Sequence, residues 1–112
     1  MTTAIHVRDD KYDQIESDDL VELILPGRNI FPLGKAILTF KQHKPIIVEI
    51  LRTSNCQIRN IPFMDISLCG LHGPEDVLLD IRAAMKDYSP LGDEIDMNEE
   101  VTVIRFRKSV LN

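Results

Sequence analysis

The chain has 112 residues, a net charge of −5 at pH 7, and the proportions of apolar and charged residues found in ordinary globular proteins. This length predicts a single domain, residues 1–112, with enough apolar surface to bury a core. No apolar stretch is long enough to predict a membrane-spanning helix, and the first residues do not resemble a signal peptide. The two cysteines do not suggest a disulfide framework, so we expect a reduced, cytoplasmic protein.

Short runs with alternating apolar residues predict several strands in the first half of the chain. The polar, acidic segment 9–18 predicts a loop. Residues 26–29 predict a turn, and residues 42–45 form a connection of hairpin length. Strands joined by such short turns are expected to pair antiparallel. The expected strands are Thr3–Arg8, Asp19–Leu25, Lys35–Phe40 and Ile46–Arg52, with Asn55–Asn60 as an extension of the sheet.

The second half of the chain predicts a short helix, a long helix and a last strand. Phe63–Cys69 has the pattern of a short helix that ends at a glycine. Pro74 suits the first position of the next helix, because the N–H that it lacks would have no partner there. Apolar residues then recur at helical spacing, with Leu79 outside the apolar face. Glu100–Arg107 is rich in β-branched residues and predicts a strand in the middle of the sheet, capped by the long helix.

Several short antiparallel strands, with helices before the last one, predict an α+β fold built on a small barrel or strongly curved sheet. This order resembles the ASCH domain family, a branch of the PUA-like β-barrels. Four motifs carry the resemblance, and together they extend over nearly the whole chain. They are the first strand ending at Arg8, the Asp-led second strand 19–23, Cys69–Leu71 before the long helix, and the Tyr88-Ser89-Pro90 loop with the last strand.

The resemblance implies a PUA-like (ASCH) mixed β-barrel with one short and one long helix before the last strand, and a function linked to RNA. Similar bacterial proteins include amidohydrolases that deacetylate N(4)-acetylcytidine, using a Lys, a Thr and a Glu. The positions that match those three residues hold Thr3, His6 and Cys69 in this chain. A Gly-x-Lys helix that precedes the first strand in those enzymes has no counterpart here. We therefore expect either a shortened relative or a start upstream of Met1.

Charge is distributed unevenly along the chain. Asp9–Glu22 holds seven acids and one lysine, and Asp93–Glu100 holds five acids and no base. Residues 24–63 hold six bases and a single acid, Glu49. These segments are either solvated loops and strand faces or, for the basic one, a surface that faces phosphates. The six bases are Arg28, Lys35, Lys41, Lys44, Arg52 and Arg59.

Arg8 has two competing interpretations. It either forms an ion pair with Asp9, Asp10 or Glu22, or its guanidinium contacts a base edge or a phosphate at the mouth of the barrel. With the resemblance, the second interpretation predicts a nucleotide-binding cleft. The residues expected to bind the nucleotide are Arg8, His6, Lys35, Arg52 and Cys69.

Cys69 and His72 have the residue types of a catalytic pair, but a cysteine in an apolar run more commonly packs in a core. We therefore assign no catalytic residue. Cys56, Cys69 and His72 do not have the spacing of a zinc site, so we expect no metal and no cofactor. The phenylalanines, which are expected in the core, are Phe31, Phe40, Phe63 and Phe106; this leaves Tyr12 as the exposed aromatic residue of the acidic segment.

Three functions remain open at this point. The preferred one is an RNA- or nucleotide-binding module with a ligand cleft at the barrel mouth, whose partner is RNA or a modified nucleoside. The second is an amidohydrolase of the N(4)-acetylcytidine type whose catalytic residues have changed or moved. The third is a module that uses the barrel as a scaffold for protein interactions.

Overall fold

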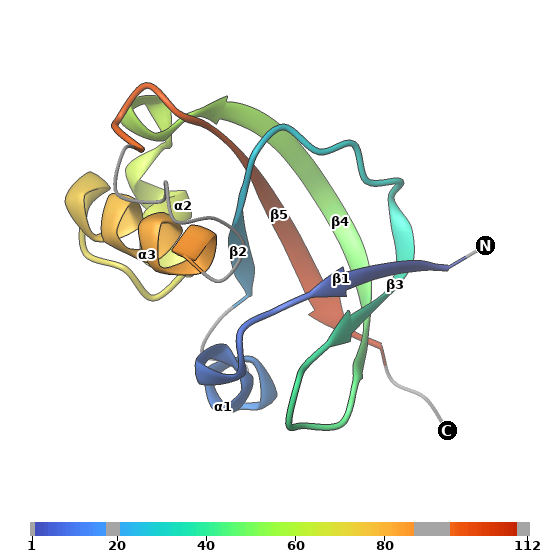
Figure 1. Ribbon diagram of the computed structural model, residues 1–112. Helices are drawn as coiled ribbons and strands as arrows, with labels where there is room; N and C mark the ends of the chain where they lie inside the picture. The colour runs from blue at the N-terminus through green and yellow to red at the C-terminus, as the bar shows by residue number, and fades with distance from the viewer. Residues whose placement is uncertain (1, 18–20, 87–94, 110–112) are drawn as a thin grey trace.

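The computed structural model describes residues 2–17, 21–86 and 95–109 of the chain. In these residues, five strands form one mixed sheet in the order β1-β3-β4-β5-β2, which curls into a half-barrel (Figure 1). Helices α2 and α3 pack together beside β2 and β5, and α1 lies at the other end of the half-barrel (Figure 1). The α+β class predicted from the sequence is confirmed. The elements are β1 (Thr3–His6), η1 (Asp9–Lys11), α1 (Tyr12–Glu16), β2 (Glu22–Pro26), β3 (Gly34–Thr39), β4 (Ile46–Gln57), η2 (Ile58–Asn60), α2 (Phe63–Leu68), α3 (Pro74–Lys86) and β5 (Glu100–Lys108).

The pairing of the strands differs in part from the predicted pattern. Strands β3 and β4 pair antiparallel, as expected for a hairpin, and β5 lies inside the sheet between β4 and β2. Strand β1, however, pairs parallel with β3. The prediction that turn-linked strands pair is wrong for β2 and β3, because the segment after the 26–29 turn crosses over the half-barrel to its other side (Figure 1). Strands β1 and β2 are thus the two edges of the sheet.

A single long strand, β4, covers the strand predicted at 46–52 and the first part of the extension predicted at 55–60, whereas residues 58–60 form η2. The first part of β4 pairs with β3, and its pairing with β5 continues to Gln57. The register with β5 shifts between Ile50 and Arg52. Such an irregularity bends a strand and increases its local twist, which helps this sheet to curl.

The predicted loop at 9–18 is wrong, because η1 and α1 occupy most of it. Ile15 explains the difference, since it is buried among the side chains of the sheet and fixes the short helix in place. The acids Asp9, Asp10 and Asp13 lie in the first turns of these helices, where the backbone N–H groups favour negative charge.

Two apolar clusters hold the half-barrel together. The first lies inside the curled sheet, with side chains from all five strands and from α1. The second lies between the sheet and helices α2 and α3, and includes Val77 and Ile81 on the predicted apolar face of α3. Phe106 is buried as expected, whereas the prediction of a core position for Phe63 is wrong. Phe63 is 71% exposed, because α2 turns Asp65 and Ile66 toward the sheet and leaves its first residue outside.

The burial of the β5 side chains determines how much stability the protein would lose if a cavity formed at this strand. Ile104 is fully buried in the first cluster, so Ile104→Ala should lower the free energy of unfolding by about 2–5 kcal/mol. Ile30→Ala provides the control, since Ile30 is 91% exposed and its truncation should change stability by less than about 0.5 kcal/mol. Urea unfolding of the two variants measures both values. Equal losses of stability in the two variants would contradict the position of β5 inside the sheet.

Candidate functional site

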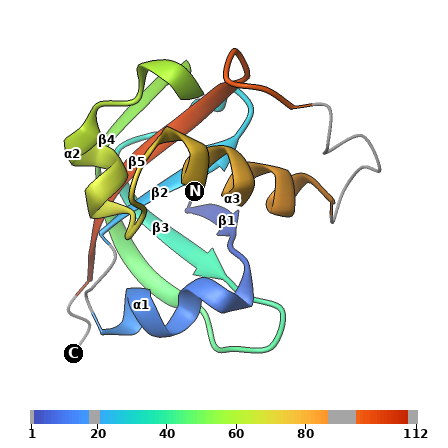
Figure 2. The same cartoon turned by 90° about the vertical axis from the view of Figure 1, so that its left-hand side faces the viewer.

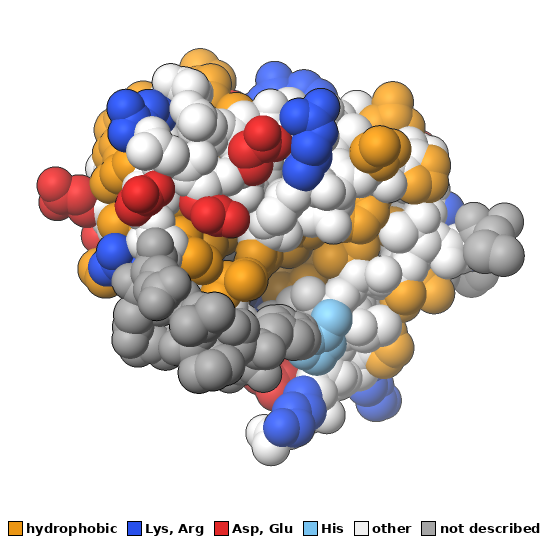
Figure 3. All heavy atoms as spheres, turned by 45° about the horizontal axis from the view of Figure 1, so that its top comes forward, with side chains coloured by type: hydrophobic (Ala, Val, Ile, Leu, Met, Phe, Trp, Pro, Cys, Tyr) orange, Lys and Arg blue, Asp and Glu red, His pale blue; other side chains and the backbone are white. Residues whose placement is uncertain are grey.

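The two edge strands, β1 and β2, face each other across a cleft of about 250 Å³, which we term the seam cleft. Edge strands carry backbone N–H and C=O groups that the sheet does not pair. The space-filling view shows a hollow with an apolar floor and a histidine side chain at its rim (Figure 3). The seam cleft is lined by Ala4–Arg8 of β1 and its end, Lys11 of η1, Leu23–Pro26 of β2, Asn29 and Phe31 of the following loop, and Asp80 and Ala84 of α3.

Three charged side chains meet at one part of the seam cleft. Arg8 Nη2 lies 2.7 Å from Asp80 Oδ1, and Lys11 Nζ lies 2.9 Å from the same oxygen. Arg8 also donates to the backbone carbonyl of Asp80 at 3.3 Å and contacts Asp10, which is largely exposed, at 3.1 Å. The Arg8, Lys11 and Asp80 side chains are 23%, 14% and 15% exposed. Two cations therefore share one mostly buried carboxylate, and the exposed Asp10 carboxylate balances the second positive charge.

This arrangement agrees with the first interpretation of Arg8, as a member of an ion pair. The ion pair with Asp10 is confirmed, whereas Glu22 and Asp9 have other partners and Asp80 takes their place. An arginine side chain carries more N–H donors than these contacts use, so the pairing leaves Arg8 able to bind a ligand.

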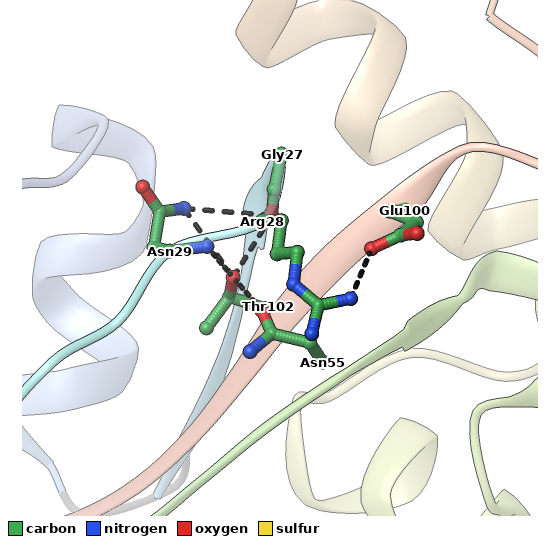
Figure 4. Close-up of polar contacts among 6 residues, drawn as sticks. All are labelled: Gly27, Arg28, Asn29, Asn55, Glu100 and Thr102. Carbon is green, nitrogen blue, oxygen red and sulfur yellow. Dashed lines mark hydrogen bonds and ion pairs between the residues drawn. The ribbon is translucent and has the colours of Figure 1, made fainter.

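Asn29 supplies a polar group near the other end of β2. Its backbone N–H donates to the Thr102 hydroxyl at 2.8 Å, and its side-chain Nδ2 donates to the Pro26 carbonyl at 3.0 Å. Since a carbonyl oxygen only accepts, the amide nitrogen of Asn29 must face Pro26. The Asn29 Oδ1 atom points away from this network (Figure 4).

The buried Thr102 hydroxyl fixes the loop that carries Asn29. It lies 2.8 Å from the Gly27 carbonyl and 2.7 Å from Asn55 Oδ1, and its single proton can be donated to only one of them at a time (Figure 4). Gly27 has a φ of 80°, a conformation that side chains disfavour. The loop is thus tied to β5 through Thr102, and through that hydroxyl to β4.

The structure brings two of the five predicted site residues into the seam cleft, His6 and Arg8. Lys35 instead lies exposed on β3, opposite Glu49 in the neighbouring strand. Arg52 lies beside α2, where its Nη2 contacts Asp65 Oδ1 at 2.9 Å. Lys35, Arg52 and Cys69 are outside the described lining of the cleft.

Three lining residues, Lys11, Asn29 and Asp80, were not predicted from the sequence. Lys11 had one visible signal, as the single base in the acidic segment. Asp80 had none, because it is separated from Arg8 by 72 positions and meets it only through the packing of α3.

The thiol of Cys69 is buried in the second apolar cluster. Burial raises its pKa, and the nearby Glu22 carboxylate acts in the same direction, so the thiol stays protonated. A nucleophilic cysteine needs the opposite shift. His72 is exposed, and its backbone N–H bonds to Asp76. Cys69 therefore has the core position that the sequence favoured.

A second charged cluster lies beside β2, outside the seam cleft. Glu22 Oε1 accepts from Arg105 Nε at 2.9 Å and lies 3.7 Å from Arg52 Nη2, while Asp65 contacts the same two arginines at 3.8 and 2.9 Å. The Glu22 side chain is 0% exposed, and its Oε2 has no donor among the described residues. Burial, assisted by the Asp65 carboxylate, raises the pKa of Glu22 to about 7 against the opposing effect of Arg105.

None of the described helices is both long and apolar enough to cross a membrane. No three histidine, cysteine, aspartate or glutamate side chains within the described ranges lie in a group that fits a metal ion.

No protein-family model and no curated protein matches this sequence. Two solved structures share its fold. The ASCH domain from Lactobacillus crispatus JV V101 has a TM-score of 0.65 and 17% identity, covering 96% of this chain and 79% of that one. A protein from Enterococcus faecalis V583, described by the family model DUF984, has a TM-score of 0.68 and 8% identity, covering 96% and 80%. These identities show the fold alone, and the ASCH-like, PUA-type fold expected from the sequence is confirmed.

The buried carboxyl of Glu22 predicts a pH dependence of stability. Its pKa of about 7 lies above the ordinary 4.5, so the folded protein binds more protons than the unfolded chain between these values. The Glu22 contribution to the free energy of unfolding should therefore fall as the pH rises through this interval, by on the order of 3 kcal/mol. Glu22→Gln should remove this loss, which urea unfolding at a series of pH values would measure.

Glu16→Gln serves as the control, because Glu16 is an exposed carboxyl of α1 and its removal should leave the pH dependence of the wild type. Parallel pH profiles for the wild type and Glu22→Gln would show that Glu22 does not titrate in this range.

Proposed function

We propose that this ASCH-like protein binds RNA by holding one nucleotide, or a modified nucleoside, in the seam cleft. The observation that carries the proposal is the pairing of an apolar cleft with two cations, Arg8 and Lys11. Its volume of about 250 Å³ is close to the lower end of the range for small-molecule pockets, roughly 300–1,000 Å³, and suits a base or nucleoside. The two free cysteines are in keeping with a cytoplasmic protein.

The base would lie between the apolar walls of the cleft. Leu25 and Phe31 offer apolar contact to the flat faces of a base, as in other proteins that hold an unstacked nucleotide. Asn29 Oδ1 would accept a hydrogen bond from an amino group on the base edge. The network around Thr102 supports this role, since it fixes the amide of Asn29 before any ligand binds.

The phosphate would bind at the opposite end of β2. Segment 8–11 and the loop after β2 lie near the two ends of this strand (Figure 1). Arg8 and Lys11 are the described cations of the cleft, and a guanidinium matches the geometry of phosphate oxygens. Asp80 would act as a positioning residue, because it holds both cations at one carboxylate oxygen. His6 would contact the ligand at the exposed side of the cleft.

Hydrolysis of an acetylated nucleoside is the second candidate, favoured by the Lys11–Asp80 pair in the cleft. An amine beside a carboxylate provides two groups that can exchange protons with a substrate. Against it, the described lining of the cleft includes no serine, threonine or cysteine that would serve as a nucleophile. Simple binding therefore has the stronger support.

Removal of the Arg8 guanidinium tests the proposed function. Arg8→Ala should weaken the binding of cytidine 5′-monophosphate by about tenfold or more, because a charge-assisted hydrogen bond is lost. Asp80 would keep Lys11 as a partner, so the protein should stay folded in a thermal melt. Amide chemical shifts, followed during titration with the nucleotide, with N(4)-acetylcytidine and with a short single-stranded RNA, measure the affinities.

Arg107→Ala is the matched control, because Arg107 is an exposed arginine paired with Glu49 and outside the cleft. Its affinities should equal those of the wild type. Free acetate in the N(4)-acetylcytidine samples would establish hydrolysis. Wild-type protein whose amide shifts do not respond to any of the three ligands would refute the proposed function and leave protein interaction as the next hypothesis.

A further inference from the structure

A stack of rings lies where the β3–β4 loop meets the start of α1. The rings of Tyr12 and His43 are nearly parallel, with centroids 4.2 Å apart and an angle of 7° between their planes. Phe40 packs edge-on against both, with centroids 5.0 Å from Tyr12 and 6.3 Å from His43. Tyr12 and Phe40 also pack against the first apolar cluster. We term these three residues the ring stack.

The ring stack is fixed to the segment that forms one end of the seam cleft. Asp9 follows Arg8 in the chain, and its Oδ1 accepts from the backbone N–H groups of Lys41 and Gln42 at 3.0 and 3.2 Å. The β3–β4 loop therefore lies beside η1, as both ribbon views show (Figures 1 and 2). A chain that leaves the cleft past Arg8 would reach this loop next.

The outer end of the ring stack is accessible. His43 is exposed, although one face of its ring is covered by Tyr12, so solvent reaches the histidine from the opposite side. Lys41 and Lys44, on either side of it in the sequence, are also exposed. Proteins that bind single-stranded nucleic acid combine an accessible ring with nearby cations, and here two exposed lysines accompany the ring in the same loop.

We propose that His43 is a stacking platform for the nucleotide next to the one in the seam cleft, with Lys41 and Lys44 facing the RNA backbone. This inference rests on the proposed function and extends it from one nucleotide to a short single strand. Because every base has a flat face, the platform accepts any base and adds affinity without reading the sequence. The cleft then selects the nucleotide, and the ring stack distinguishes a strand from a free nucleotide.

Two ligands separate the platform from the cleft. Cytidine 5′-monophosphate occupies the cleft alone, whereas a cytidine pentanucleotide also reaches His43. The pentanucleotide is made in two forms, with 2-aminopurine on one side or on the other side of the central residue. The wild type should bind the pentanucleotide more tightly and quench the fluorescence of the stacked 2-aminopurine on one of the two sides. His43→Ala should weaken pentanucleotide binding by about tenfold and abolish the quenching, with the affinity for the mononucleotide unchanged.

Two further variants complete the test. His43→Phe should restore both the affinity and the quenching, because it keeps a flat ring over Tyr12. His72→Ala, which removes an exposed histidine near the start of α3, should behave as the wild type. Unchanged pentanucleotide affinity in His43→Ala, or a wild type that binds both ligands equally, would overturn the platform while the cleft assignment stands. A wild type that binds neither ligand would overturn the proposed function and the platform with it.

Discussion

The contact of Arg8 and Lys11 with Asp80 is the constraint on which the rest of the site depends. The sheet is open, and its edge strands approach each other without a ladder of backbone hydrogen bonds between them. Helix α3 crosses this opening and holds the end of β1 through a carboxylate that is mostly buried. The three side chains therefore tie the segment after β1 to the helix that packs beside β2.

The second edge strand, β2, is held by different interactions on its two faces. Leu23 packs inside the half-barrel, whereas Glu22 and Ile24 face the helices. Glu22 joins the strand to Arg105 of β5, and Thr102 in the same strand ties down the loop that follows β2. One end of β2 is therefore fixed by a buried carboxyl and the other by a buried hydroxyl. A frame that is already fixed does not have to reorganise when a ligand binds, so little of the binding energy is lost.

Local patterns explain what could be predicted from the sequence. The apolar spacing of α3, the β-branched run of β5 and the burial of Cys69 all depend on neighbouring residues, and each is confirmed. The position of Arg8 in a cleft followed from the family resemblance. Asp80 and Asn29 could not be found in this way, because their roles arise from contacts between segments far apart in the chain. The parallel pairing of β1 with β3 likewise depends on how the whole sheet curls.

The central position of β5 has a consequence for how the protein is made. Strand β5 comes last among the described elements, yet it lies between β4 and β2, and Val48 pairs with Lys108. During synthesis, β2 and the far half of β4 leave the ribosome long before the strand that joins them exists. These edges stay open until β5 has been synthesised, and pairing of such distant segments is slow. A ribosome that pauses shortly before β5 would hold a chain with two unprotected strands, which is the form most exposed to aggregation and to chaperones.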